Sequence, residues 1–258
     1  MITISVIMPC YNCGEYISDA IDSVIKQTFH DWELIIIDDG STDDSATIAY
    51  KYSQKNKRIK IIRQENAGVI SARNNGIRSA RGKYIYPLDA DDKIAPNCLD
   101  LLYKTISETN CAVAACEVEK FGTQSGQFVF HGDPTKSNMY QYNCICNGSL
   151  FAKSDWDKYG GYDSQFKCGL EDYDFWLNFI DDNRIITRIP KILYYYRIKP
   201  GDLSRNNIAM KSHDDLMRKL RKKHKNIIVY SIYRKIKSIF YKRTKRHVYI
   251  LSIPIKRI

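Results

Sequence analysis

The sequence predicts an α/β fold in which a mostly parallel central sheet is flanked by helices. In the first 110 residues, apolar strand-like runs alternate four times with helix-like segments, a pattern typical of parallel, doubly wound sheets. The run ELIIIDD is apolar and mostly β-branched up to its acidic end, as expected of a strand buried on both faces. Polar clusters follow three of the runs, at the edge where such sheets bind ligands.

The first strand is expected at residues 4–9 and the second at 33–39. Between them a helix should pack on the sheet, because apolar residues recur at helical spacing: Ile17, Ala20, Ile21, Val24 and Ile25. A polar helix should follow the second strand and run to about Asn56, with capping residues supplied by the DDGSTDDS turn.

The third strand is expected at residues 59–63, followed by a loop and a helix over 66–82 that Gly82 ends. Residues 83–88 predict the fourth strand. Pro96 then opens another helix, because proline is tolerated in the first helical turn.

The second half of the chain is less regular. Residues 111–121 and 127–131 have the composition of strands, and residues 170–183 carry apolar side chains at roughly helical spacing. Residues 184–198 predict one or two strands, broken at Pro190.

The positive charge is concentrated at the C-terminal end. Residues 205–258 contain 17 Lys and Arg against two acidic residues, a charge of +15, whereas residues 1–204 contain 23 basic and 27 acidic residues, a charge of −4. We therefore expect one domain over residues 1–204, with halves at 1–110 and 111–204, and a basic helical C-terminal tail over 205–258. Such a tail favours an anionic surface as its partner.

Composition argues against several classes of protein. With 44% apolar and 27% charged residues, the chain should be globular. It has no run of about 18 apolar residues and no basic region of a signal peptide, which predicts a cytoplasmic protein. Its eight cysteines include the pairs Cys10–Cys13 and Cys144–Cys146. A zinc site is one interpretation, but the irregular spacing without nearby histidine favours free thiols.

Three carboxylates lie within four positions after the fourth strand: Asp89, Asp91 and Asp92. Like charges this close raise one another's pKa, so the cluster needs a physical reason. It can form a turn and a cap for the next helix. Alternatively it can hold a divalent cation, because Mg²⁺ and Mn²⁺ prefer oxygen ligands and commonly use one or two carboxylates together with substrate phosphates.

Two further polar clusters follow strands, CYN at 10–12 and DDGS at 38–41. A carboxylate there can accept hydrogen bonds from a base or a ribose, and Arg73 can supply positive charge to phosphate or stack on a base. Each feature is weak alone. Three polar clusters at three successive strand ends favour a site for a nucleotide and a metal.

Three segments together resemble the motifs of family 2 glycosyltransferases, which are inverting enzymes with the GT-A fold. They are VIMPCYNCGEYISDAIDSVIKQTFHDWELIIIDDGSTDDS, NAGVISARNNGIRSARGKYIYPLDADD and GLEDYDFWLNF. The resemblance covers about residues 3–204, and the combination of motifs is specific. It implies a metal-dependent enzyme of the hexosyltransferase type that uses Mn²⁺ or Mg²⁺, with a nucleotide-binding first half and an acceptor-binding second half.

The resemblance implies a role for each nucleotide-side residue. Pro9 and Tyr11 would flank and stack the base of a sugar nucleotide, and Asp39 would bond the base edge. Arg73 would support the base and the phosphates.

The remaining roles fall on carboxylates. DADD matches the D-x-D motif of the family, which would place Asp89 toward the ribose and Asp91 toward the metal, with Asp92 able to share or replace Asp91. Asp172 matches the general base, with Glu171 beside it near the acceptor. The alternative for this last pair is an acidic first helical turn, which the helix dipole favours.

One position departs from the family pattern. In YRIKPGDLS at 196–204, Lys199 stands where family members commonly have histidine. A protonated lysine cannot ligate a cation but can pair with a diphosphate. This leaves open any metal contact from this segment, and Lys199 can equally be a solvated loop residue.

Other functions fit parts of the sequence. A sugar nucleotidyltransferase should carry an early glycine-rich triphosphate loop. Neither G-x-G-x-x-G nor G-x-x-x-x-G-K-[ST] occurs in the sequence, which argues against this class of enzyme. A hydrolase with paired carboxylates has no need of a nucleotide pocket. A nucleic-acid-binding protein could use the basic tail, but DADD and LEDYDFW would then have no purpose, so no nucleic-acid partner is expected.

The expected donor is a nucleotide sugar, with a UDP-sugar favoured, and the expected acceptor is a glycan or lipid-linked oligosaccharide of cell-surface polysaccharide synthesis. In the tail, Lys and Arg flank an apolar helical stripe, the pattern of a helix lying in an anionic membrane surface: Ile228, Ile232, Ile236, Ile239 and Phe240. A helix packed on the domain is the alternative. A tail helix lying in the membrane surface would make this a peripheral protein at the inner face of the cytoplasmic membrane.

Overall fold

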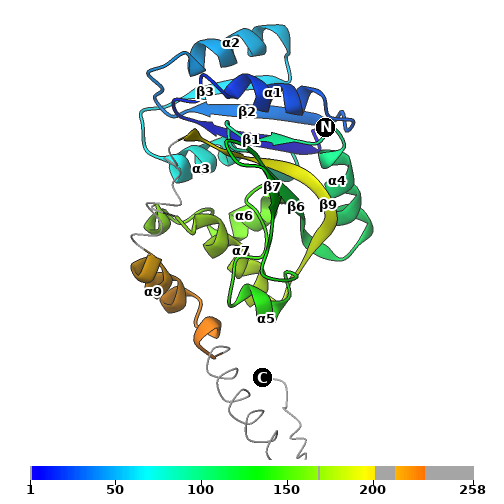
Figure 1. The fold of residues 1–258 in the computed structure, drawn as a ribbon, viewed down its shortest axis with the longest axis vertical. Coiled ribbons are helices and arrows are strands. Elements are labelled where there is room, and N and C mark those ends of the chain that lie inside the picture. Colours follow the sequence, from blue (N-terminus) through cyan, green and yellow to red (C-terminus); the bar gives the residue numbers. More distant parts are fainter. Residues whose placement is uncertain (1, 168, 201–212, 230–258) are drawn as a thin grey trace, which may run out of the picture.

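The computed structural model describes residues 2–167, 169–200 and 213–229 (Figure 1). Within them the expected α/β architecture is confirmed. The described strands pair into one sheet in the order β3-β2-β1-β4-β8-β6-β9-β5, and β7 adds to β6. The amphipathic helix expected after Ile228 lies almost entirely outside the described residues.

The first half shows the expected alternation of strands and helices. Its elements are β1 (Ile4–Cys10), α1 (Ile17–Ile25), β2 (Trp32–Asp38), α2 (Ser45–Lys55), β3 (Ile59–Arg63), α3 (Val69–Ser79), β4 (Tyr84–Pro87), β5 (Lys93–Ile94) and α4 (Cys98–Glu108). Strand β1 pairs in parallel with β2 and β4, and β2 pairs in parallel with β3. The carboxyl ends of these strands therefore meet at one edge, as predicted.

Different helices cover the two faces of this sheet (Figure 1), because successive side chains of a strand point to opposite faces. Met8 and Ile36 belong to the core that includes α1, whereas Ile7 and Ile37 belong to the core that includes α3. Helix α3 lies so close to the sheet that a Cβ on Gly76 would come within 2.4 Å of Ile37 and 2.7 Å of Ile7. This contact therefore requires glycine, and it fixes the depth of the helix that carries Arg73.

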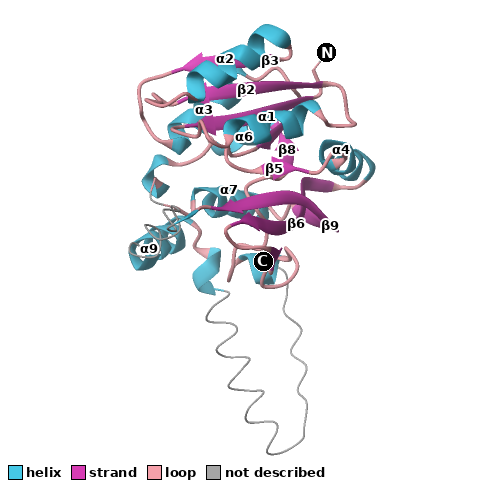
Figure 2. Ribbon diagram, turned by 45° about the horizontal axis from the view of Figure 1, so that its top comes forward, coloured by secondary structure: helices cyan, strands magenta, loops and turns pink. Residues whose placement is uncertain are grey.

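The second half extends the same sheet (Figure 2). Its elements are β6 (Cys111–Gly122), β7 (Gly126–Phe128), α5 (Lys136–Met139), β8 (Leu150–Ala152), α6 (Lys153–Tyr159), a 3₁₀ turn (Ser164–Phe166), α7 (Glu171–Asp181), β9 (Ile185–Ile198) and α9 (His213–Lys223). Strand β8 is antiparallel to β4 and β6, whereas β9 runs parallel to β6. The long strand β9 thus reaches from the end of α7 back to the D-x-D turn.

Pro190 does not break β9 into two strands. The pairing with β6 steps from Cys116–Ile189 to Glu117–Ile192, so that Pro190 falls in a bulge. Proline has no N–H to give to a strand ladder, and a bulge leaves its residue unpaired. The expected break is therefore a local irregularity within one strand.

Helix α9 and the residues after it pack against α7. The buried residues of this segment join the core of α7: Leu216, Leu220 and Ile227. His224 is 2% exposed and lies between two carboxylates of α7, with Nε2 3.0 Å from Asp174 Oδ1 and Nδ1 2.6 Å from Asp181 Oδ2. Part of the sequence beyond residue 204 thus packs against residues of the second half, and the domain boundary at 204 stays a prediction.

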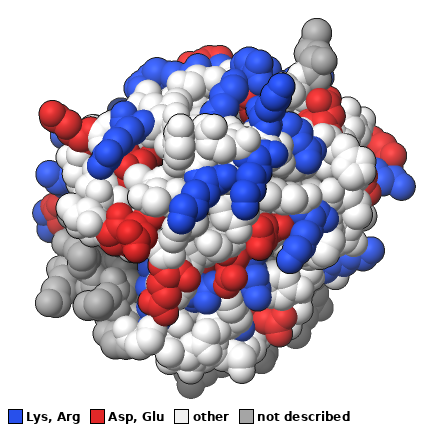
Figure 3. Space-filling model, turned by 90° about the horizontal axis from the view of Figure 1, so that it is seen from above, with Lys and Arg blue, Asp and Glu red and all other residues white. Residues whose placement is uncertain are grey.

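Two properties of the described residues bear on location and surface. No helix among them is both long and apolar enough to cross a bilayer. On the face shown in Figure 3, Lys and Arg side chains are interspersed with Asp and Glu. Among the described residues drawn on this face, positive and negative side chains are therefore mixed.

Candidate functional site

The loops after β1 and β2 are joined by hydrogen bonds. Asn12, at φ 51°, accepts from the backbone N–H of Thr42 through its side-chain oxygen (2.8 Å), and its own backbone N–H donates to Ser41 Oγ (3.1 Å). The neighbouring Tyr11 is 49% exposed, whereas Pro9 is buried within β1. Of the two residues predicted to flank a base, Tyr11 thus has a ring open to a ligand.

Asp39 holds the loop that leads into α3. Its carboxylate accepts from the side chain of Gln64 (2.7 Å) and from the backbone N–H groups of Ala67 (2.9 Å) and Gly68 (2.9 Å). The side chain is buried by these contacts. Its contact with a base stays a prediction, and its present bonds position the helix that bears Arg73.

Arg73 links the two halves of the candidate site. Its Nη2 donates to Asp89 Oδ1 (2.7 Å) and its Nη1 to Glu171 Oε1 (2.8 Å), and the side chain is buried. Burial opposes its charge, but the carboxylates of Asp89 and Glu171 raise the pKa of Arg73 above its usual value. The guanidinium is therefore a fixed cation that brings the D-x-D turn beside α7. Its contact with phosphate stays a prediction.

The other two carboxylates of the DADD turn have different environments. Asp92 is 1% exposed and accepts from Tyr194 Oη (2.6 Å) and from the backbone N–H of Arg197 (2.7 Å). Burial, followed by the charges of Asp91 and Asp89, raises the pKa of Asp92 well above its usual value. Asp91 is more open, with a side chain 24% exposed and Oδ2 2.6 Å from Lys199 Nζ.

These residues suit a divalent cation best together with a diphosphate. Across the described residues, no three His, Cys, Asp or Glu side chains converge as a metal site, and the seven cysteines described are free thiols. Both oxygens of Asp92 already accept hydrogen bonds, so Asp91 is the accessible carboxylate of the two. One carboxylate with phosphate oxygens is a common donor set for Mg²⁺ and Mn²⁺. The metal roles of Asp91 and Asp92 stay predictions.

The candidate base lies in the first turn of α7. Leu170 precedes this helix at φ 64°, a left-handed conformation that costs a bulky residue of order 1–3 kcal/mol. Asp172 Oδ1 accepts from the backbone N–H of Tyr173 (2.7 Å), and Oδ2 accepts from Asn143 Nδ2 (3.1 Å). Burial, followed by the charge of Glu171, raises the pKa of Asp172 to about 6. A carboxylate with this pKa suits general-base chemistry near neutral pH.

Two residues of this arrangement escaped the sequence reasoning. Asn143 sits in an irregular loop, where a single asparagine has no periodic pattern to distinguish it. Leu170 reads as an ordinary apolar helix residue, although Gly169 before it is a weak sign of an unusual turn.

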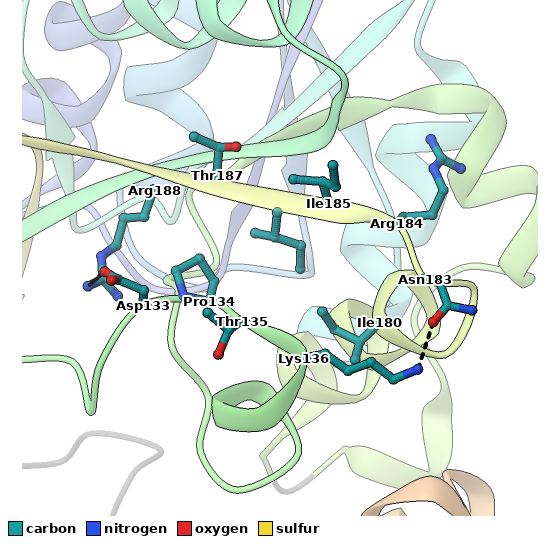
Figure 4. Close-up of a pocket in the computed structure, with 11 residues that line it drawn as sticks. Asp133, Pro134, Thr135, Lys136, Ile180, Asn183, Arg184, Ile185, Thr187 and Arg188 are labelled. Atoms are coloured by element: carbon teal, nitrogen blue, oxygen red, sulfur yellow. Dashed lines mark hydrogen bonds and ion pairs between the residues drawn. The ribbon is translucent and has the colours of Figure 1, made fainter. Parts of the chain in front are cut away.

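A separate cavity of about 450 Å³ lies between the start of α5, the end of α7 and the start of β9 (Figure 4). Pro134, Ile180 and Thr187 are among its lining residues. Lys136 at its rim donates to Asn183 Oδ1 (2.7 Å). None of the predicted site residues lines this cavity, so it is distinct from the carboxylate cluster.

Comparison with known proteins shows the family of the chain. Residues 5–165 match the model of the family described as glycosyl transferase family 2. The chain belongs to this family. The glycosyltransferase GlyA of Streptococcus pneumoniae is 34% identical over 78% of this chain and 31% of its own length. The chondroitin synthase of Escherichia coli is 41% identical over 40% of this chain and 16% of its own length. The chain thus spans less than a third of either relative.

Solved structures confirm the expected GT-A fold of this family 2 glycosyltransferase. Staphylococcus aureus TarS in complex with UDP is similar with a TM-score of 0.66 and 25% identity, over 78% of this chain and 62% of that one. The mannosyltransferase PcManGT from Pyrobaculum calidifontis, in complex with GDP-Man and Mn²⁺, has a TM-score of 0.67 and 16% identity, over 88% of this chain and 69% of that one.

Proposed function

We propose that the protein transfers a sugar, with inversion, from a nucleoside diphosphate donor to a hydroxyl of a glycan acceptor in bacterial polysaccharide synthesis. The observation that carries this proposal is the bridge from Asp89 through Arg73 to Glu171, with bonds of 2.7 and 2.8 Å. It supports a single site in which a donor-binding turn and a carboxylate base act on the same pair of substrates.

The proposed step uses Asp172 as the base. Asp172 takes the proton of the acceptor hydroxyl while that oxygen forms a bond to the anomeric carbon. The bond from the anomeric carbon to the diphosphate oxygen breaks on the opposite face, and the nucleoside diphosphate leaves with the electron pair. With its pKa at about 6, Asp172 is ionised at neutral pH and ready to accept this proton.

The proposed donor is a UDP-sugar. Tyr11 would stack on the base, Asp39 would bond the base edge and Asp91 would meet the cation on the diphosphate. The likeness to TarS, whose structure contains UDP, supports this choice of nucleotide. Mn²⁺ or Mg²⁺, when bound, supplies positive charge that stabilises the departing diphosphate.

The proposed acceptor is a growing glycan carried on a lipid. A relative named as a chondroitin synthase supports a glycan, and the charge of +15 over residues 205–258 supports contact with anionic membrane. Cosedimentation with anionic and neutral vesicles tests the membrane contact. Binding should require anionic lipid and weaken with salt, and equal sedimentation with both lipids would refute it.

The donor is tested by thermal unfolding of the full chain with a panel of UDP-, GDP- and other nucleotide sugars, with and without Mn²⁺. The correct donor should raise the melting temperature by mass action. Turnover is then measured with that donor and a panel of glycan acceptors, and the anomeric configuration of the product is determined. No stabilisation by any nucleotide sugar, or a retained configuration, would overturn the proposal.

A further inference from the structure

The carboxylate of Asp91 already has a cationic partner within the chain. Lys199 Nζ lies 2.6 Å from Asp91 Oδ2, and the two side chains are 31% and 24% exposed. Both groups are thus in contact with each other and still open to a ligand. A divalent cation approaching Asp91 would meet this ammonium group at the same oxygen.

The ion pair is held in place by backbone bonds. The backbone N–H of Arg197 donates to Asp92 Oδ1 (2.7 Å), and Arg197 Nε donates to the carbonyl oxygen of Asp91 (2.7 Å). The end of β9 is thereby fastened to the DADD turn two residues before Lys199. The flexible stem of Lys199 can then swing its charge over a few ångströms while its backbone stays fixed.

Two positive charges cannot share one carboxylate oxygen at low cost, because they repel at contact distance. Of the other two carboxylates in the turn, Asp92 accepts hydrogen bonds at both oxygens and Asp89 pairs with Arg73 at 2.7 Å. A diphosphate removes this competition for Asp91, because its oxygens can bind both a metal ion and an ammonium group.

We propose that Lys199 and a divalent cation exchange on Asp91. Without a donor, Lys199 holds the Asp91 carboxylate and keeps the metal off. When a nucleotide diphosphate binds with its metal, the metal takes Asp91 and Lys199 moves to a phosphate oxygen. The second half of this exchange rests on the proposed function, whereas the first concerns the donor-free protein alone.

The test is direct Mn²⁺ binding to the full chain without nucleotide, followed by the electron paramagnetic resonance signal of free aqueous Mn²⁺. Lys199→Met keeps most of the unbranched side chain and removes its charge. We expect it to bind Mn²⁺ at least about tenfold more tightly than the wild type. Lys199→Arg keeps a charge at this position and should bind Mn²⁺ as weakly as the wild type.

Two further variants locate the effect. Adding Asp91→Asn to Lys199→Met should remove the gain in Mn²⁺ affinity. Lys60→Met is the matched control, because Lys60 also pairs with a carboxylate, that of Glu33 at 3.1 Å, and it should leave Mn²⁺ affinity unchanged. Circular dichroism establishes that each variant is folded.

The second measurement is the effect of UDP on the Mn²⁺ affinity of each variant. UDP should raise the Mn²⁺ affinity of the wild type more than that of Lys199→Met, because the wild type must first release Asp91. Equal Mn²⁺ affinities of wild type and Lys199→Met without nucleotide would overturn the exchange and leave the proposed function intact. If no nucleotide binds any variant, the proposed function fails while the metal comparison still decides the first half of the exchange.

Discussion

Asn143 donates a side-chain N–H to the carboxylate of Asp172, with 3.1 Å between Nδ2 and Oδ2. Asn143 comes from the loop before β8 and Asp172 from the first turn of α7. Burial and then the charge of Glu171 raise the pKa of Asp172 to about 6, and this hydrogen bond lowers it. The pair therefore favours the ionised form of the candidate base, alongside Arg73 and the backbone N–H of Tyr173.

The first prediction concerns the pH dependence of turnover. A base with a pKa of about 6 is protonated below that pH, so turnover should fall as the pH drops through about 6. Asn143→Ala removes a bond to the ionised form and should move this acidic limb upward by about one pH unit. Asn138→Ala, in the same region, serves as control. If the acidic limb of the pH profile stays in place in Asn143→Ala, the hydrogen bond from Asn143 does not affect the pKa of the base.

The second prediction separates the base from donor binding. Asp172→Asn keeps the shape of the side chain and removes its basicity, so turnover should fall by roughly 10²–10⁴-fold. Titration calorimetry should show UDP affinity little changed. Near-normal turnover, or a loss of UDP binding in its place, would contradict the assignment of Asp172.

The third prediction distinguishes the two candidate metal ligands. Asp91→Asn should weaken Mn²⁺-dependent UDP binding at least about tenfold, because it removes the accessible carboxylate. Asp92→Asn should keep most of that binding and lower the melting temperature, since Asp92 ties Tyr194 and Arg197 to the turn. The reverse pattern, measured by calorimetry with and without Mn²⁺, would move the metal role to Asp92.

The fourth prediction concerns stability at rising pH. Burial of the His224 ring opposes its charge, but hydrogen bonds with Asp174 and Asp181 raise the pKa of His224 above its usual value. Such a group stabilises the fold fully below its unfolded pKa of about 6.5, and this contribution is lost as the pH rises through the folded pKa. Lys223 also faces this cluster, with Nζ 2.8 Å from Asp174 Oδ2, and Asn226 donates to Asp181.

Urea unfolding across pH 6 to 9 measures this contribution. The free energy of unfolding of His224→Gln should lie below that of the wild type at pH 6, and the gap should narrow toward pH 9. His213→Gln changes an exposed histidine at the start of α9 and should show no gap. A gap that stays constant with pH would mean that packing, rather than charge, accounts for the role of His224.

The fifth prediction concerns the bridge made by Arg73. Arg73→Met leaves Asp89 and Glu171 without their shared cation, and breaking a buried pair costs about 3–5 kcal/mol. Arg218→Met breaks an exposed pair with Asp215 and should cost much less, because solvent screens exposed ion pairs. Urea unfolding compares the two variants. Similar small losses in both would show that Arg73 does not hold the two segments together.

Local patterns were enough to predict the first half of the fold. Strands β1 to β4 and their helices follow from apolar periodicity, because each of these elements buries one stripe or two faces. The sequence left open whether residues 184–198 form one strand or two, since a bulge that accommodates Pro190 depends on the partner strand. The hydrogen-bond partners of Asp92 and Asp172 could not be predicted from the sequence either, because they come from distant segments: Tyr194, Arg197 and Asn143.

The bond between Arg73 and Glu171 joins residues 98 positions apart in the chain. Closing a loop of that length is entropically costly, so contacts of this kind form late when a chain folds. During refolding from urea, far-ultraviolet circular dichroism should therefore recover before UDP binding and turnover. A partly folded chain would contain most of its helices and strands and still be inactive, which delays catalysis until both halves of the molecule have come together.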